Sequence, residues 1–501
     1  MNRTGKQETV ILGMVSLSSD VARGVAPPLR VTLPRASLRS VIRRAFDVAR
    51  VTRRHFTPLL RRRRRGVRIA DTDIAHALRN TFADLGGSFV KFGQLIASSP
   101  GVFGVAIADE FRSCLDTGPS EPFADIRTEV EVTHGRPLAE TFASFDQTPI
   151  GRASVAVVHS ARLRGGRVVA VKVLRPGIEH LMATDLRLME PLLRFLARRV
   201  GLVTAGQLFR MLASFREQVS EELDLRNELR AMAHFRRVLE EGDLPAVTVP
   251  EPLPELCGPR VLVMEFLEGV PIDDLSHVAE FGLDPRPIVD QIVRGWFLTT
   301  LRDGLFHGDV HAGNLMLLRD GRIGVLDWGI VGRLDAATHR FYRRLIEACL
   351  GDQSGWHDVA QHVASFYGAA TLQTLGLDGD GLVSFVRGLL EPILTAPLSE
   401  VNLFALVAAV QGQTIAEGPD ASVRPRLSTW RRMREQRRFH AQFVAHGGLG
   451  GRLDRNMFLL GKQIMYFERY GKMFIPDLPL LADREFYRRL MGIPARHVGE
   501  D

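Results

Sequence analysis

One stretch of this 501-residue chain constrains its fold more than any other. Residues 306–314 read Phe-His-Gly-Asp-Val-His-Ala-Gly-Asn, so Asn314 follows Asp309 by five positions, and residues 327–329 read Asp-Trp-Gly. Between them, apolar runs flank the dipeptide Asp320-Gly321, a pattern that predicts a short β-hairpin with a tight turn. Such a hairpin would bring Asn314 and Asp327 to one place.

An aspartate, an asparagine five positions later and an Asp-x-Gly turn are typical of the protein-kinase catalytic centre. Phosphoryl transfer builds negative charge, so the protein must hold divalent cations and orient the acceptor. We expect Asp327 and Asn314 to bind Mg²⁺ beside ATP, and Asp309 to accept a proton from a hydroxyl or to orient a water. The alternative is a surface loop, rich in His and Asp, that fits the pattern by accident.

A second pattern lies upstream and predicts another β-hairpin. Apolar residues at 155–163 and 168–173 flank a turn at 164–166, and the second run ends in Val-Ala-Val-Lys172-Val. In kinases this lysine contacts the α and β phosphates. The residues before the hairpin, Gly151, Arg152, Ala153 and Ser154, are mostly small and would let the backbone approach a nucleotide. The alternative is a plain surface hairpin with one exposed lysine.

Acidic residues that could hold this lysine lie at 221–228, which we interpret as one helix containing Glu222 and Glu228. Six residues turn a helix by about 600°, so the two glutamates cannot share a face and two separate roles are expected. Residues 260–269 read as a buried strand leading into a linker. In a kinase this segment joins the two lobes, and its backbone, here around Glu265 and Leu267, meets the adenine.

Residues 71–85 have helical periodicity, and a second apolar segment with Lys91 and Gln94 follows. Burying these two polar side chains is costly unless they find partners, so position alone favours the solvent side of the helix. After Gly332 the chain reads as helical to its end, with Pro392, Pro397, Pro425 and Pro476 as interruptions. That part shows no catalytic pattern; residues 461–470 are interpreted as an amphipathic helix that packs in the core.

The net charge of +8 is concentrated near the N-terminus. Residues 43–68 contain eleven arginines and one acid, with an unbroken run from Arg61 to Arg65. Such a block can bind an anionic membrane surface, stay solvated or pair within the protein, or contact nucleic acid. Apolar residues are interleaved with it, which favours lipid, and no specific nucleic acid is expected. These residues are Phe46, Val48, Phe56, Leu59 and Leu60.

Three cysteines lie far apart, which argues against both a disulfide framework and a zinc site. No apolar run approaches the length of about 18 residues that a transmembrane helix needs. Residues 10–17 could form a poor signal peptide, but an ATP-using enzyme belongs inside the cell. We therefore expect a cytoplasmic protein that can lie on the inner face of a membrane.

In this order the motifs resemble the UbiB-type atypical kinases, also called the ADCK or AarF family. Residues 91–94 match the family's Lys-x-Gly-Gln signature, residues 151–154 its alanine-rich loop, residues 222–224 its Glu-x-Asp motif and residues 307–314 its catalytic loop. Glu228 falls where the partner glutamate of Lys172 is expected. This chain departs from the family pattern at Arg152 and at Trp328, which replaces a phenylalanine, but no metal or phosphate ligand is lost.

The resemblance implies an α+β, protein-kinase-like fold of two lobes, a β-rich N-lobe and a helical C-lobe, with an N-terminal helical extension. It implies that Lys91 and Gln94 point into the pocket, pair with the Glu-x-Asp acids and exclude a protein substrate. The implied activity is that of an Mg²⁺-dependent ATPase or small-molecule kinase in isoprenoid quinone or lipid metabolism. Two alternatives stay open: a nucleotide-sensing, pseudokinase-like lipid chaperone, and a phosphotransferase of the antibiotic-kinase type.

The expected division of the chain has five parts. They are a basic, partly disordered arm (1–70), a helical extension (71–147), a kinase-like N-lobe (148–267), a C-lobe with the catalytic loop (268–350) and a helical C-terminal part of that lobe (351–501).

Overall fold

The computed structural model describes residues 27–97, 107, 110–111, 121–197, 202–274, 281–282, 284, 286–367, 379–401 and 455–493. The chain divides into two compact units. The first contains residues 1–281 and 312–331, and the second contains residues 282–311 and 332–501. The five predicted domains are a finer division and stay a prediction. The expected leader before residue 27 and Pro425 lie outside the described residues.

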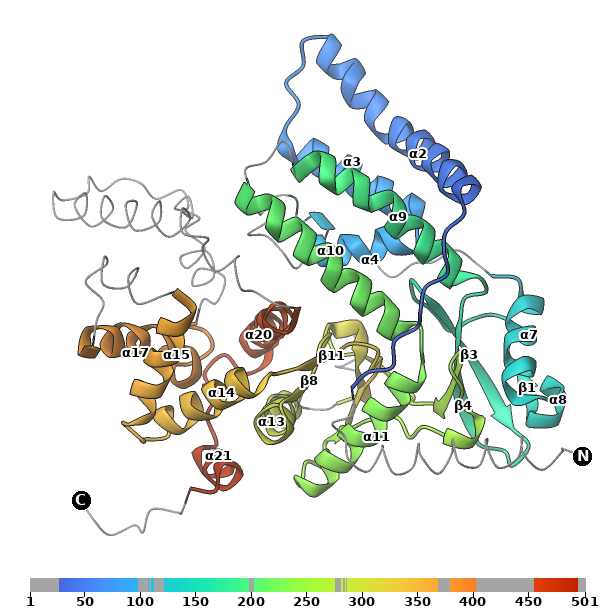
Figure 1. Ribbon diagram of the computed structural model, residues 1–501. Coiled ribbons are helices and arrows are strands. Elements are labelled where there is room, and N and C mark those ends of the chain that lie inside the picture. Colours follow the sequence, from blue (N-terminus) through green and yellow to red (C-terminus); the bar gives the residue numbers. More distant parts are fainter. Residues whose placement is uncertain are drawn as a thin grey trace, which may run out of the picture. The chain divides into compact units, whose positions relative to one another are not determined.

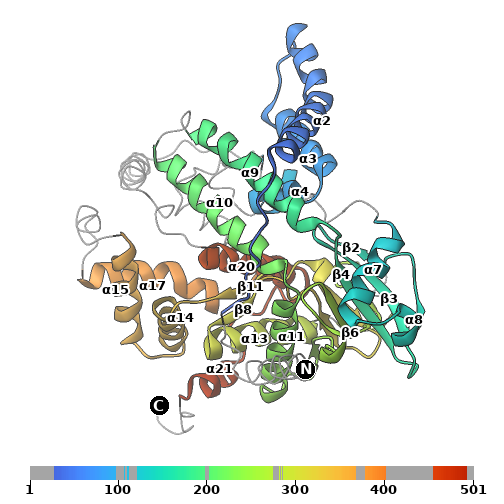
Figure 2. The same ribbon diagram turned by 45° about the vertical axis from the view of Figure 1, so that its right-hand side comes forward.

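The first unit begins with an extended segment and a group of packed helices (Figures 1 and 2). Pro27, Pro28 and Pro34 lie outside any helix, and the side chain of Ser37 caps α2 by accepting the Ser40 N–H. The helices are α2 (Leu38–Arg64), α3 (Asp71–Leu85), α4 (Ser88–Ala97), α9 (Ile178–Ala197) and α10 (Leu202–Glu222). The helix predicted at 71–85 is confirmed.

A five-stranded antiparallel sheet forms the next part of the first unit. Its strands are β1 (Phe142–Phe145), β2 (Gly151–Arg152), β3 (Ala156–Leu163), β4 (Val168–Leu174) and β6 (Val261–Glu265). The predicted hairpin is β3–β4, with Val158 opposite Lys172. The buried face of the sheet packs around valines such as Val157, Val171 and Val263, together with Ile126 of α7 (Phe123–His134). Lys172 therefore rises from a rigid strand in the middle of the sheet.

The second predicted hairpin is also confirmed and belongs to the first unit. It consists of β9 (Leu315–Leu318) and β10 (Ile323–Val325), and β5 (Val247–Thr248) and β7 (Gly269–Pro271) complete a four-stranded sheet. Gly321 has a φ of 84° in the turn, a conformation that glycine adopts at no steric cost. The register sets Val325 opposite Leu315, so the residues just outside the pair, Asn314 and Leu326, also lie together.

The single helix predicted around residues 221–228 is wrong. Helix α10 ends at Glu222, and α11 (Arg226–Glu241) begins after a three-residue break. In the break, the N–H of Leu225 donates to the carbonyl of Pro259 at 2.9 Å, and the Asp224 carboxylate accepts the N–H of Arg226 at 3.1 Å. These bonds satisfy backbone groups that a continuous helix would have paired internally. Glu222 and Glu228 therefore come from different helices.

The second unit is mainly helical, as the sequence predicted. Its elements are α13 (Arg286–Asp303), β8 (Leu305–His307), α14 (Ala336–Cys349), α15 (Gly355–Tyr367), α17 (Gly379–Thr395), α20 (Arg455–Phe474) and α21 (Arg484–Met491), and β8 pairs with β11 (Val331–Arg333). Trp296 packs edge-on against Phe467, which lies in the helix expected at 461–470. Pro392 does not interrupt a helix: it lies inside α17.

Among the described residues, no helix is both long enough and apolar enough to cross a membrane. Cys257 and Cys349 are free thiols, as the cysteine spacing predicted, and Cys114 lies outside the described residues.

Candidate functional site

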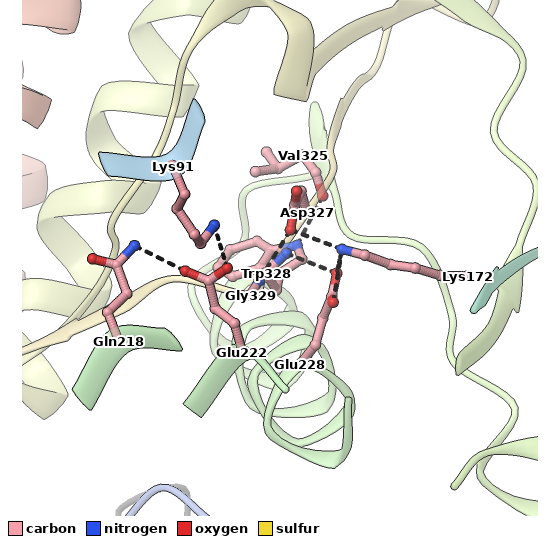
Figure 3. A network of polar contacts seen from close by, with 9 residues as sticks. All are labelled: Lys91, Lys172, Gln218, Glu222, Glu228, Val325, Asp327, Trp328 and Gly329. Carbon is pink, nitrogen blue, oxygen red and sulfur yellow. Dashed lines mark hydrogen bonds and ion pairs between the residues drawn. The ribbon is translucent and has the colours of Figure 1, made fainter. Parts of the chain in front are cut away.

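The centre of the site is Lys172, a lysine that is only 6% exposed. Its ammonium donates to Glu228 Oε1 and to Asp327 Oδ1, each at 2.9 Å (Figure 3). Glu228 lies in the first turn of α11 and is buried, whereas the side chain of Asp327, just after β10, is 40% exposed. Three elements far apart in the sequence thus meet at one cation, and only the Asp327 side of the cluster is open.

The three charges change one another's proton affinity. Burial alone would lower the pKa of Lys172, but the carboxylates of Asp327 and Glu228 outweigh it and raise this pKa. Burial tends to raise the pKa of Asp327, yet the charge and hydrogen bond of Lys172 dominate and lower it. Burial raises the pKa of Glu228 to about 7, and the neighbouring Asp327 charge adds to the rise, while Lys172 opposes it. Near neutral pH, Lys172 and Asp327 are charged and Glu228 is partly protonated.

The turn after Asp327 is bound to helix α11. The N–H of Trp328 donates to Glu228 Oε1 at 3.2 Å, and the N–H of Gly329 donates to Asp327 Oδ1 at 3.2 Å. The indole of Trp328 is buried, packs against Phe235 of α11 with ring centroids 4.2 Å apart and ring planes tilted by 34°, and donates to the Val325 carbonyl at 2.8 Å. The tryptophan that replaces the usual phenylalanine therefore anchors the turn.

Asp327 itself has a backbone φ of 52°, in the left-handed region. This conformation is uncommon for a residue with a side chain, costs about 1–3 kcal/mol and persists only where the surroundings impose it. Two contacts of the Asp327 carboxylate hold this conformation: one with the Lys172 ammonium and one with the Gly329 N–H.

Asn314 lies at the base of the β9–β10 hairpin, next to Leu326, the residue that precedes Asp327. It ends a short 3₁₀ helix, η2 (Ala312–Asn314), is buried, and its carbonyl accepts the Leu326 N–H at 2.8 Å. Within the described ranges no group of three or more His, Cys, Asp or Glu residues could hold a metal by itself. A carboxylate and an amide oxygen nonetheless fit Mg²⁺, which binds few protein ligands and completes its shell with phosphate oxygens and water.

A second buried lysine lies near the first. Lys91 of α4 pairs with Glu222 at the end of α10, and both side chains are buried (Figure 3). Gln218, one helical turn before Glu222, donates to the other carboxylate oxygen at 2.8 Å. The charge of Lys91 also contributes to lowering the pKa of Asp327, so it acts electrostatically on the Lys172 cluster. The solvent-facing interpretation of Lys91 is wrong, because a glutamate compensates its burial.

The other polar residues of the Lys-x-Gly-Gln and Glu-x-Asp motifs are Gln94 and Asp224. Gln94, on the same helix as Lys91, is half-buried. Asp224, the second acid of the Glu-x-Asp motif, binds the guanidinium of Arg226 at 2.6 Å and accepts the N–H of Arg226, the first residue of α11, at 3.1 Å. The expected pairing of Lys91 with a Glu-x-Asp acid is observed for Glu222, and Asp224 instead joins the helix start.

The loop expected to hold a nucleotide leads into the central sheet. Gly151 and Arg152 form β2 against β3; Arg152 is exposed and Ser154 is buried. The carbonyl of Ala153 accepts two bonds from the guanidinium of Arg175, at 3.1 and 3.0 Å. A buried arginine thus fixes the loop.

Two residues are expected near the adenine: Glu265 is the last residue of β6, and Leu267 follows that strand by two positions. The Glu265 side chain accepts the Glu251 N–H at 3.1 Å, and Glu265 returns its own N–H to the Glu251 carbonyl at 2.8 Å. Leu267 is buried and packs so closely on Gly324 that a Cβ there would lie 2.7 Å from its Cδ1. These contacts hold the end of β6 in place and leave the role of both residues a prediction.

Asp309 belongs to the second unit, where it follows strand β8 and is half-buried. Its N–H donates to Nδ1 of the buried His307 at 2.9 Å. Because Nδ1 accepts, a neutral imidazole carries its proton on Nε2. His307 therefore fixes the backbone on the N-terminal side of Asp309.

The sequence analysis did not identify two residues that bind site residues, Gln218 and Arg175. Gln218 has a spacing signal, since it lies four residues before Glu222 and such pairs meet on a helix surface. Arg175 has no comparable signal: it follows Lys172 by three residues at the end of a strand, and only the folded sheet brings it to Ala153.

The basic arm, helix α2, is exposed around its arginine run. Arg62 pairs with Asp73 at 3.1 Å, while Arg44 binds the buried Asp185 at 2.7 Å and so fastens the arm to α9. Phe46 and Leu60, two of the interleaved apolar residues, are exposed, together with Leu38 and Ile42. The other three, Val48, Phe56 and Leu59, are half-buried. The arm thus presents apolar and cationic side chains at once.

Comparison with known proteins gives a consistent result. The family model described as the ABC1 atypical kinase-like domain matches residues 114–360. An Arabidopsis thaliana protein, described as an uncharacterized aarF domain-containing protein kinase of the chloroplast, is 32% identical over 415 residues, which cover 81% of this chain and 73% of the relative.

Two bacterial relatives are similar to the same extent. An uncharacterized protein of Mycobacterium tuberculosis is 33% identical over 410 residues, which cover 81% of this chain and 76% of the relative. A protein of Aeromonas salmonicida, described as probable protein kinase UbiB, is 31% identical over 390 residues, which cover 70% of this chain and 68% of the relative.

Proposed function

The chain belongs to the ABC1 family of atypical kinase-like proteins, with its α+β kinase-like fold, and from this premise we propose that it is an Mg²⁺-dependent atypical kinase or ATPase. One observation supports the proposal above all: the buried ammonium of Lys172 bonds to both Glu228 and Asp327 at 2.9 Å. A charge arrangement of this kind is costly to bury and is typical of a functional site.

Each member of the cluster has a role in the proposal. Lys172, oriented by Glu228, contacts the α and β phosphates of ATP, and Asp327 with Asn314 holds Mg²⁺ through oxygen atoms. When bound, the metal neutralises charge that develops on the phosphate oxygens. Asp309, five residues before Asn314 in the chain, accepts the proton of the acceptor hydroxyl or orients a water.

The nucleotide itself is proposed to lie along the sheet of the first unit. Gly151, Arg152, Ala153 and Ser154 contact its phosphates, and the backbone at Glu265 and Leu267 meets the adenine. The hydrogen bond from Arg175 to the Ala153 carbonyl supports this placement of the phosphates, because a loop that is ordered before the ligand binds loses less entropy on binding.

Lys91 and Gln94 are proposed to restrict what enters the site. Lys91, on helix α4 of the N-terminal extension, pairs with the buried Glu222 at the end of α10, and its charge contributes to lowering the pKa of Asp327. A closed pair of this kind admits water or a small acceptor more readily than a protein chain. We therefore place the acceptor among small molecules, with isoprenoid lipids and quinone precursors first, since several relatives are described as UbiB.

The α2 arm is proposed to bring the enzyme to an anionic membrane surface from the cytoplasmic side. The run from Arg61 to Arg65 is exposed and would meet acidic headgroups, at about 1 kcal/mol for each arginine near the surface. Exposed Phe46 and Leu60 would enter the interface between headgroups and acyl chains. The Arg62–Asp73 pair supports the competing interpretation of an arm that is satisfied within the protein.

The test compares ATP turnover and Mg-ATP-induced thermal shift for wild type, Asp327→Asn and Asp320→Asn. Asp320 lies in the turn of the same hairpin, pairs with Arg322 and is exposed, which makes it a matched control. We expect Asp327→Asn to lower turnover by about 10²–10³-fold, as loss of a charge-stabilising group does, and Asp320→Asn to behave as wild type. The assay is run with and without anionic liposomes and a quinone head-group mimic.

The other outcomes have definite meanings. If wild type and Asp327→Asn ignore Mg-ATP equally, the enzyme proposal is wrong. Binding without turnover under every condition favours a nucleotide-sensing lipid chaperone. Phosphate transfer to a hydroxylated metabolite, with little ATP hydrolysis in its absence, favours a small-molecule phosphotransferase.

A further inference from the structure

Helix α20, near the C-terminal end of the described chain, binds the residue that follows Asp309. The Val310 N–H donates to Gln463 Oε1 at 2.9 Å, and the Tyr470 hydroxyl donates to the Val310 carbonyl at 3.2 Å. Both hydrogen bonds are buried, and all three residues belong to the second unit. Both backbone polar groups of Val310 are thus held by side chains from one helix.

The burial of these side chains calls for an explanation. Gln463 is 0% exposed, and its Nε2 finds no hydrogen-bond partner in the described part of the chain. An amide buried in this way is costly, and an apolar side chain of similar volume would fill the space without that cost. The bond that Gln463 does make, to the Val310 N–H, is therefore the contact that distinguishes it from a packing residue.

The spacing of Gln463 and Tyr470 explains how one helix binds both the N–H and the carbonyl of Val310. Gln463 and Tyr470 are seven residues apart, two helical turns, and so lie on the same face of α20. Val310 is buried between them, and Phe467 on the same helix is buried against Trp296 of α13. A helix fixed in this way offers a rigid support.

Asp309 therefore lies in a backbone that is held on both sides. His307 accepts the N–H of Asp309 itself, and α20 holds the next residue, Val310. We infer that Gln463 and Tyr470 are positioning residues that set where the Asp309 carboxylate stands during the reaction. The inference rests on the proposed function, in which Asp309 is the base. Misplacement of a catalytic group by about 1 Å can lower a rate by about 100-fold.

The experiment uses the full chain and the variants Tyr470→Phe and Gln463→Leu, which remove the bonding atoms with little change in volume. Tyr487→Phe is the matched control, since Tyr487 is also buried in the second unit and donates to the Leu480 carbonyl at 3.0 Å. The readouts are kcat and KM for ATP, together with hydrogen–deuterium exchange of a peptide that contains Val310.

We expect kcat to fall about 5-fold in Tyr470→Phe and about 10-fold or more in Gln463→Leu, with KM for ATP within about 2-fold of wild type. Exchange at Val310 should accelerate in Gln463→Leu and keep the wild-type rate in Tyr487→Phe. A fall in kcat that comes with loss of exchange protection throughout the second unit would indicate a folding defect and overturn the inference.

Two further results separate this inference from the proposed function. An active wild type whose two α20 variants keep the wild-type kcat overturns the positioning role and leaves the enzyme proposal intact. A wild type without any turnover refutes the enzyme proposal, and it also refutes the positioning role, which depends on that proposal.

Discussion

The buried charges of Lys172 and Lys91, both in the first unit, are compensated in different ways. Lys172 and Lys91 are each 6% exposed, and each meets carboxylate oxygens from another element. Lys172 faces two carboxylates, of which Asp327 is 40% exposed, whereas Lys91 pairs with the buried Glu222. With all groups ionised, the first cluster carries one excess negative charge, and the second pair is neutral.

This difference in charge indicates different roles. A cluster with excess negative charge and one open carboxylate is suited to receive a cation from solution. The Lys91–Glu222 pair is buried and neutral, so it has no such tendency, and Gln218 also donates to Glu222. The comparison supports the proposed roles of nucleotide binding for Lys172 and restricted access for Lys91, and three substitutions test it.

The largest effect is expected for Lys172→Met. The substitution leaves Glu228 and Asp327 together without a cation, and removing one partner of a buried charge network costs about 3–5 kcal/mol. Because Asp327 is partly solvated, we expect the lower end, about 3–4 kcal/mol at pH 8, measured by denaturant unfolding without nucleotide. The Mg-ATP-induced thermal shift should disappear.

The double variant Lys172→Met with Glu228→Gln is the control, since it removes one of the two stranded carboxylates and should recover part of the loss. Unfolding free energies equal to wild type in the single variant would show that Lys172 is not the electrostatic centre.

The second prediction uses the raised pKa of Glu228. A carboxyl whose pKa is higher in the folded state stabilises the fold while it is protonated, and this contribution is lost as the pH rises from about 4.5 to about 7. Wild type without nucleotide should lose about 3 kcal/mol from this group between pH 4.5 and pH 8. Glu228→Gln cannot titrate, so its stability curve should lack this decrease.

Glu240→Gln removes one negative charge from the exposed face of the same helix and serves as the control. Parallel pH–stability curves for wild type and Glu228→Gln would contradict the assignment of a raised pKa to this glutamate.

The smallest effect is expected for Lys91→Met. Glu222 loses its cation but keeps the hydrogen bond from Gln218, so the cost should be about 2 kcal/mol of unfolding free energy. The Mg-ATP-induced thermal shift should remain, in contrast to Lys172→Met. The double variant with Glu222→Gln should restore most of the stability. A loss of nucleotide binding as complete as in Lys172→Met would mean that the two lysines share one role.

Local patterns in the sequence predicted much of this structure. The β3–β4 hairpin follows from two apolar runs and a glycine turn, and β9–β10 follows from Asp320-Gly321 between apolar runs. Ser37 follows Pro34 by three residues and caps the start of α2 with its side chain. In each case the signal lies within a few residues, where turn and cap chemistry acts directly on the backbone.

Features that depend on distant residues were missed or wrong. Residues 222–226 contain neither glycine nor proline, yet the helix breaks there because Leu223 and Leu225 are both buried and the Pro259 carbonyl accepts the Leu225 N–H. Gln463 was interpreted as core packing, because nothing near it in the sequence reveals that its amide meets Val310.

The sequence by itself determined the order of Lys172, Glu228, Asp309, Asn314 and Asp327 along the chain, and this order is sufficient to indicate a kinase-like family. Only the tertiary structure decided their state. The exposure of Asp327, the raised pKa of Glu228 and the burial of Lys91 against Glu222 depend on distances between elements far apart in the chain. Burial and Coulomb interactions depend on position in space, and a linear pattern does not contain that information.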